Sequence, residues 1–301
     1  MTLPIILCMI VRDEADTIAG VLEAARPYVD GFAIVDTGSV DGTVEECRRA
    51  IVGRPAYIAL RGWPGRFDYA RAWAWGWAQE VDGAGDDHLR LELSGDSYLS
   101  GTLNRDVLTP EVDGLTVRSY MGPITWRRPK ITRSGRGWKY QGRLHEIAVM
   151  EGRAPVLADS GLVIHHRGRG EGAKEQGGRS EYVAMMMADL EERPDDPRTV
   201  FYAAQTLDVA GRWGEARALY EQRIRMGGWE QERYIAALRV ARRAAEDGWP
   251  VEDVVPLIER VIGICEARPE GWEMLDCHIT AKAKRENPRD DWLFYEPTPR
   301  G

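Results

Sequence analysis

IILCMIVRDEADTIAGVLEAARPYVDGFAIVDTGSVDGT, at residues 5–43, is the stretch that decides the fold. Residues 5–11 form a continuous apolar run, which is too short for a membrane span and typical of a buried parallel strand. Apolar residues then recur at helical spacing through 18–25, and residues 32–35 form a second apolar run. The order strand, helix, strand predicts an α/β fold with a mostly parallel sheet.

The second strand leads into the loop DTGSVDGT, which begins at Asp36. The loop carries carboxylates, hydroxyls and glycines at the carboxyl end of a strand, where open α/β sheets bind ligands. The first strand is followed by Arg12, Asp13 and Glu14, which place acid at a helix start, where the helix dipole favours it. The alternative interpretation of the loop is an ordinary Asx-turn between strand and helix.

This stretch resembles the opening of family 2 glycosyltransferases with the GT-A fold, in which a strand, N-E-E or D-E, a helix and a strand lead to V-D-T-G-S-x-D-G-T. The resemblance implies a Rossmann-like GT-A domain with a nucleotide-sugar site. It implies that Asp36 accepts hydrogen bonds from the base or ribose of a UDP-type donor. The other donor-binding positions that it implies here are Val11, Asp13, Glu14 and Ser39.

Composition limits the classes of partner. The 301 residues are 44% hydrophobic and carry a net charge of −8, which gives no general attraction to nucleic acid or an anionic membrane. The apolar runs are far below transmembrane length, and the N-terminus lacks the positive region of a signal peptide. Four scattered cysteines without metal-like spacing indicate free thiols. We therefore expect a cytoplasmic protein with no membrane partner.

The segment FDYARA, residues 67–72, resembles the family's D-F-A-x-A-R-N. Asp68 and Arg71 lie three residues apart, so a helix would place them on one face. The resemblance implies that both line the donor pocket, in contact with uracil or diphosphate. The alternative is a surface ion pair of little energetic worth.

The metal motif of the family, usually L-D-A-D-E, aligns with residues after the strand 89–93. Two acids there hold Mg²⁺ or Mn²⁺, which neutralises the donor diphosphate. In this chain the first acid is Ser94, and Gly95 and Asp96 follow. The resemblance implies that Gly95 and Asp96 contact the donor and that Asp96 alone supplies the carboxylate for the metal.

A late strand, residues 161–166, ends in His165 and His166. The family commonly places a histidine here as a late metal ligand, which implies a partner for Asp96. Successive strand residues face opposite ways, so one of the two histidines points at the site, and His165 is the preferred candidate.

The segment WKYQGRLHE, residues 138–146, resembles the family's W-x-G-x-x-H-E. An inverting transferase needs a carboxylate to take a proton from the acceptor, and Glu146 is the predicted base. The resemblance places Trp138, His145 and, from the basic stretch 126–136, Arg128 on the acceptor side. The alternatives are a solvated charged hairpin and a Glu on the first turn of a helix.

The pattern changes after the glycine-rich segment 168–178, and helical spacing dominates from residue 180. Y-x-A-x-x-L, G-R-W and A-x-x-x-Y between proline breaks resemble tetratricopeptide repeats. Such helical pairs need neighbours to bury their apolar faces. We expect a catalytic domain at 1–172 and an all-α helical-repeat domain at 173–301, which docks on the first domain or on a second copy in a homodimer.

The expected function is transfer of a sugar from a nucleotide-diphosphate sugar, with UDP as the expected nucleotide, with inversion and with Mn²⁺ or Mg²⁺. The acceptor is a peptide or protein, a glycan or a DNA base. One alternative is a phage-type DNA-base glycosyltransferase that acts on hydroxymethylated pyrimidine, with residues 127–143 as its phosphate-binding face. Another is a catalytically degenerate nucleotide-sugar or protein-binding module, which Ser94 favours.

Overall fold

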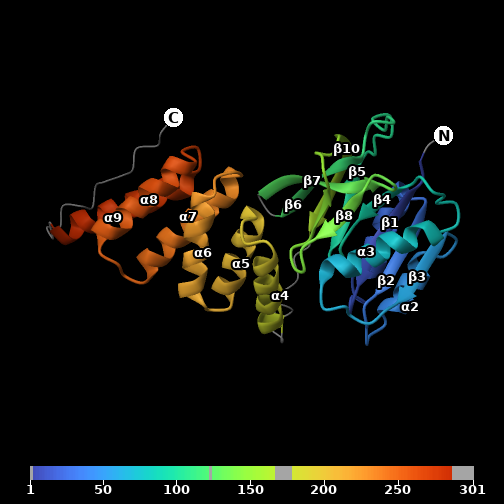
Figure 1. Cartoon of the computed structure of the whole chain (residues 1–301), viewed down its shortest axis with the longest axis horizontal. Coiled ribbons are helices and arrows are strands. Elements are labelled where there is room, and N and C mark those ends of the chain that lie inside the picture. The colour runs from blue at the N-terminus through green and yellow to red at the C-terminus, as the bar shows by residue number, and fades with distance from the viewer. Residues whose placement is uncertain (1–2, 122–123, 167–177, 287–301) are drawn as a thin grey trace. The chain divides into compact units, whose positions relative to one another are not determined.

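The computed structural model describes residues 3–121, 124–166 and 178–286. The chain divides into two compact units, residues 1–178 and 179–301. The first unit combines strands and helices, whereas the described part of the second consists of helices and their connections (Figure 1).

The first unit is built on an eight-stranded sheet of order β3-β2-β1-β4-β7-β6-β10-β5. Four neighbouring strands at one side run parallel, and β10 runs parallel to β6. Two strands, β7 and β5, run antiparallel to their neighbours. The strands are β1 (Ile5–Val11), β2 (Gly31–Asp36), β3 (Ala56–Leu60), β4 (Leu89–Glu92), β5 (Ser97–Gly101), β6 (Gly114–Met121), β7 (Ile124–Arg133) and β10 (Leu157–His166).

Strand β1 is covered on both faces, which explains its continuous apolar run. Ile5, Leu7 and Met9 belong to a core shared with α1 (Ile18–Ala25) and α2 (Thr43–Ala50). Ile6 and Cys8, which alternate with them along the strand, belong to a second core. That core also includes residues of α3 (Phe67–Trp77) and of the hairpin formed by β8 (Trp138–Gln141) and β9 (Ile147–Met150). The carboxyl ends of β1, β2 and β4 lie at one edge because the three strands are parallel neighbours.

The four cysteines are free thiols, as the sequence predicts. Cys8 and Cys47 are buried, and burial raises the pKa of each thiol to about 12. These two thiols therefore stay protonated and serve as small apolar core residues.

The helices of the second unit enclose a separate core around Tyr220 and Tyr234. The buried Arg223 guanidinium donates to Glu232 at 3.0 Å within this unit. No helix in the described part of the chain is long and apolar enough to cross a membrane. The helices are α4 (Gly178–Glu192), α5 (Pro197–Val209), α6 (Trp213–Arg225), α7 (Glu230–Glu246), α8 (Val251–Ile264) and α9 (Pro269–Glu286).

The predicted fold class is confirmed: a mostly parallel α/β sheet is followed by an all-α region. The resemblance of the helical pairs to tetratricopeptide repeats stays a prediction, as do the predicted domain limits.

Candidate functional site

Asp36 ends β2 and shapes the loop that follows it. Its Oδ1 accepts the backbone N–H groups of Gly38 and Ser39, each at 3.0 Å, and its Oδ2 accepts the Ser39 hydroxyl. The side chain is only 4% exposed. The carboxylate predicted to bind a base or ribose therefore first holds its own loop in a fixed conformation.

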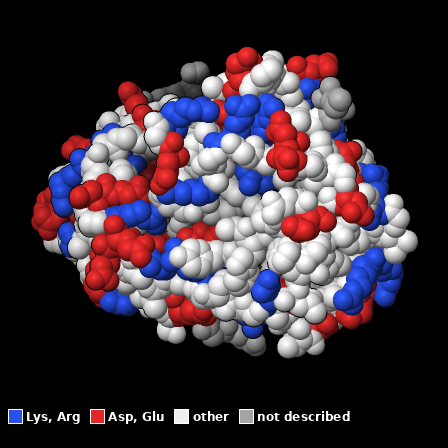
Figure 2. All heavy atoms as spheres, turned by 45° about the vertical axis from the view of Figure 1, so that its right-hand side comes forward, with Lys and Arg blue, Asp and Glu red and all other residues white. Residues whose placement is uncertain are grey.

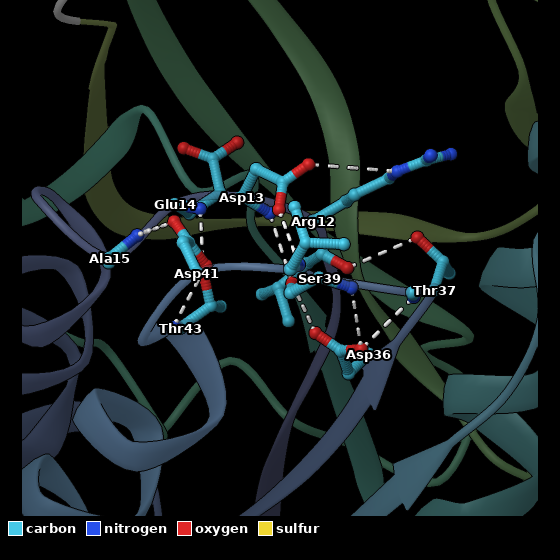
Figure 3. Close-up of polar contacts among 12 residues, drawn as sticks. Arg12, Asp13, Glu14, Ala15, Asp36, Thr37, Ser39, Asp41 and Thr43 are labelled. Atoms are coloured by element: carbon cyan, nitrogen blue, oxygen red, sulfur yellow. Dashed lines mark hydrogen bonds and ion pairs between the residues drawn. The ribbon is translucent and has the colours of Figure 1, made fainter.

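Hydrogen bonds connect this loop to the end of β1 and to the residues that follow it (Figure 3). Ser39 Oγ accepts the Asp13 N–H at 3.0 Å, and Asp13 Oδ1 accepts the Val40 N–H at 2.8 Å. The Thr37 hydroxyl donates to the carbonyl of Val11 at 3.1 Å. The predicted donor residues of β1 and β2, separated by a helix in sequence, thus form one connected edge.

A second set of hydrogen bonds connects Glu14 to the start of α2 (Figure 3). Thr43 Oγ accepts the Glu14 N–H at 2.7 Å, and Asp41 Oδ1 accepts the Thr43 N–H at 3.0 Å. The Thr43 hydroxyl bond lowers the pKa of Asp41. On the opposite side, a Cβ on Gly95 would lie 2.8 Å from Cδ of Glu14, so the loop after β4 packs closely on the loop after β1.

Two residues other than glycine have a left-handed backbone among the described residues, Asp13 with φ 50° and His145 with φ 57°. Such a conformation costs on the order of 1–3 kcal/mol and is typical of functional loops. Both lie at positions that the sequence predicts to contact donor or acceptor. The strain supports a site at these two loops.

Arg71 connects the predicted base to the predicted metal loop. From α3, its Nε donates to Glu146 Oε1 at 2.8 Å, and its Nη1 donates to the Leu93 carbonyl at 3.0 Å. Its Nη2 donates to Ser94 Oγ at 3.3 Å. The side chain is 8% exposed, so these are buried, charge-assisted bonds.

Asp68 lies on the same helix but takes a different partner. Its carboxylate accepts two bonds from Arg66, at 2.7 Å each, and one from the Tyr69 N–H at 2.9 Å. The fork geometry is that of a bidentate pair. Asp68 and Arg71 are therefore not paired with each other, and Asp68 anchors the first turn of α3.

Glu92 completes the charge balance around Arg71, a role that the sequence pattern does not predict. The Lys130 ammonium and the Tyr140 hydroxyl donate to Glu92, the latter at 2.9 Å, and Arg71 lies 3.8 Å away. Burial raises the pKa of Glu92, but Lys130 and Arg71 outweigh it and bring the pKa to about 2. In LRLEL, Glu92 shares its face with Arg90 and keeps the alternation of apolar and polar residues, so the pattern alone predicts an exposed acid. Its burial comes from the second face of the sheet, where Tyr140 of β8 contacts it.

Burial disfavours the charge of Arg71 itself, but Glu92 and Glu146 outweigh burial and raise its pKa. Burial lowers the pKa of Lys130 in spite of Glu92, and burial together with Glu92 raises the pKa of Tyr140 well above its usual value. Arg71 therefore stays charged and holds the carboxylate of Glu146 in position.

The structure brings His166, rather than the preferred His165, to Asp96. The Ser97 hydroxyl donates to Asp96 Oδ1 at 3.1 Å and lies 2.9 Å from His166 Nδ1. His165 Nε2 instead lies 2.8 Å from the hydroxyl of Ser100, and its ring stacks on Tyr98. Neighbouring strand residues face opposite ways, so the two histidines serve different faces.

Asp96 and His166 fit a metal that is shared with a phosphate. Because the Ser97 hydroxyl donates to Asp96, its oxygen is left to accept the His166 Nδ1–H, and the lone pair then lies on Nε2. Nε2 is buried and has no hydrogen-bond partner among the residues that the structure describes. A ligating histidine usually has this second hydrogen bond. Within the described ranges, no cluster of three or more His, Cys, Asp or Glu could hold a metal, so substrate oxygens would have to complete the shell.

The basic stretch is largely neutralised by acids. Arg127 pairs with Asp159, Arg133 with Asp87 and Lys139 with Glu151. Figure 2 shows acidic and basic side chains interspersed over the face that it displays. These pairs weaken the interpretation of residues 127–143 as a phosphate-binding face for DNA.

Arg128 and Trp138, both predicted to lie on the acceptor side, differ in their surroundings. Trp138 is 7% exposed within a hydrophobic core, and its Nε1–H donates to the Asp113 carbonyl at 2.9 Å, so it stabilises the fold. Arg128 lies with its Cζ 5.7 Å from the ring centroid of Trp126 and has no acidic partner among the described residues.

Comparisons with known proteins found distant likenesses only. No family model and no curated protein matches the chain. Glucosyl-3-phosphoglycerate synthase from Mycobacterium tuberculosis, solved with phosphoglyceric acid, is 18% identical with a TM-score of 0.28, over 40% of this chain and 45% of that one. The chain thus matches under half of that enzyme's length.

TarS residues 1–349 from S. aureus is 11% identical with a TM-score of 0.39, over 95% of this chain and 92% of that one. The same protein in complex with UDP gives a TM-score of 0.35 at 11% identity, over the same shares. These likenesses are too distant to carry a function, which is therefore argued from the residues of the site.

Proposed function

We propose that the first unit is a glycosyltransferase of the GT-A type, similar to family 2, which uses a nucleotide-diphosphate sugar with UDP as the expected nucleotide. One observation carries the proposal: Arg71 binds Glu146 and, at the same time, the carbonyl of Leu93 and the hydroxyl of Ser94. The predicted base and the loop that leads to Asp96 are therefore parts of one site. The hydrogen-bonded loops that contain Asp13 and Asp36 would form the donor side of this site.

In the proposed reaction, Glu146 takes the proton of an acceptor hydroxyl, thiol or amine. The acceptor atom bonds to the anomeric carbon as the bond to the diphosphate oxygen breaks, with inversion, and the nucleoside diphosphate leaves. Arg71 contacts Oε1 of Glu146 and thereby orients the carboxylate. A bound Mn²⁺ or Mg²⁺, held by Asp96 and His166, would neutralise the diphosphate. Asp13, Ser39 and Glu14 hold the two loops that would receive the nucleotide.

Calorimetry with UDP-, GDP-, TDP- and CDP-sugars, each with and without Mn²⁺, tests this function. We expect metal-dependent binding of one nucleotide and slow release of its sugar to water. Absence of binding by all four would contradict the proposal.

A second candidate function is a degenerate binding module. Ser94 occupies the position of the first metal acid, and its hydroxyl accepts from Arg71 at 3.3 Å instead. Such a module would bind the nucleotide without turnover, so sugar release separates the two functions.

For the acceptor, a peptide or protein is our proposal, because helical repeats commonly present binding surfaces of this kind. Homodimerisation through the helical region and a cytoplasmic location stay predictions. A titration with duplex DNA at rising salt tests the DNA-base alternative, which requires binding that falls steeply with salt.

A further inference from the structure

Three buried polar atoms on neighbouring side chains have no hydrogen-bond partner within the described part of the chain. They are Trp126 Nε1, Arg128 Nε and His166 Nε2. The Trp126 ring stacks on the His166 ring, with centroids 5.6 Å apart and planes 12° apart. Buried polar atoms are nearly always paired in proteins, so a group of unpaired ones indicates a missing partner.

The strand geometry explains why these side chains share one face. Trp126 and Arg128 lie two residues apart on β7, so they point the same way, and Arg127 between them points the opposite way. Arg127 accordingly reaches Asp159, whereas Arg128 has no acidic partner in the described part of the chain. Two neighbouring arginines thus differ in whether their charge is balanced.

The chemistry of the cluster favours an anion. Trp126 Nε1 and Arg128 Nε are N–H donors. The Arg128 guanidinium, which no acid among the described residues neutralises, suits the oxygens of a phosphoryl group in bidentate geometry. Ser97 connects His166 to Asp96, so the cluster lies beside the proposed metal position.

We propose that Trp126 and Arg128 form a phosphoryl-binding subsite beside His166. This inference rests on the proposed function for its setting and adds residues that the donor and metal motifs do not include. The phosphoryl group has two possible sources: the diphosphate of the donor, or a phosphate carried by the acceptor.

Calorimetry on the full chain distinguishes the sources. In the first arm, uridine and UDP are each titrated into the protein in the presence of Mn²⁺. If the donor supplies the phosphoryl group, Arg128→Met should reduce the ratio of UDP affinity to uridine affinity by at least about tenfold. In the second arm, inorganic phosphate is titrated onto UDP-saturated protein, and Arg128→Met should abolish its binding if the acceptor supplies the group.

Arg127→Met is the matched control and should leave both arms unchanged, because its charge is already paired with Asp159. Trp126→Phe removes the N–H donor and keeps a ring for stacking, so it tests the subsite even if Arg128→Met fails to fold. Loss in either arm from these two substitutions supports the subsite.

Wild-type behaviour of both variants in both arms would overturn the subsite. Failure of both uridine and UDP to bind the wild-type protein would count instead against the proposed nucleotide site. Inorganic phosphate titrated onto the protein without UDP would then still report on Arg128. The two failures are therefore distinguishable.

Discussion

Glu146 keeps its carboxylate against a buried guanidinium, 2.8 Å from Arg71 Nε. In the proposed reaction, Glu146 accepts a proton in the transfer step. We expect Glu146→Gln to retain nucleotide affinity, because the amide oxygen can still accept from Arg71. Transfer or sugar hydrolysis should fall by roughly 10²–10⁴-fold. Calorimetry measures the nucleotide affinity, and single-turnover kinetics measure the rate of transfer or hydrolysis. A rate equal to that of the wild-type protein would exclude Glu146 as the base.

Asp96 carries the carboxylate of the proposed metal site. Asp96→Ala should lower Mn²⁺-dependent UDP affinity by at least about tenfold, the scale on which changes to metal-site residues act. Affinity without metal should change little. Asp82→Ala, at an exposed position in a turn before β4, serves as the control. Equal metal dependence in Asp96→Ala and wild type would exclude Asp96 as a ligand.

At the scale of elements, Glu92 joins β4 to β7 and β8 through Lys130 and Tyr140. Its pKa falls from 4.5 to about 2, so the folded protein binds fewer protons than the unfolded chain between these values. The stabilisation is present above about pH 4.5 and is lost as the pH falls toward 2.

Glu92→Gln should therefore lower the free energy of unfolding at pH 7 by roughly 3–5 kcal/mol, because Lys130 and Arg71 lose a buried partner. It should also flatten the loss of stability below pH 4.5. Urea unfolding at pH 7, 4 and 3 gives both quantities. Glu45→Gln, in an exposed pair with Arg48, is the control and should follow wild type. If the free energy of unfolding falls as steeply below pH 4.5 in Glu92→Gln as in the wild-type protein, this account is wrong.

At the scale of the whole molecule, each of the two units has its own hydrophobic core. We expect scanning calorimetry to resolve two unfolding transitions. UDP with Mn²⁺ should raise the midpoint of one, because a ligand that binds a native unit stabilises it by mass action. A single transition that moves as a whole would show that the units unfold cooperatively.

The sequence by itself determined the features that depend on neighbours along the chain. The apolar run of β1, the helical spacing of α1 and the Asp36 loop each follow from local sterics, periodicity and turn chemistry. The α/β class and the helical second region could be predicted for the same reason. The candidate positions Asp13, Ser39, Asp96 and Glu146 came from a resemblance, and their contacts could not be read from it.

Only the tertiary structure decided which of these residues meet. Arg71 and Glu146 lie 75 residues apart in sequence, and packing of α3 against β8 brings them together. His166, and not His165, contacts Ser97 because the register of β10 with β5 pairs these two residues. Strand register and burial depend on the whole sheet, so a pattern within one segment cannot specify them.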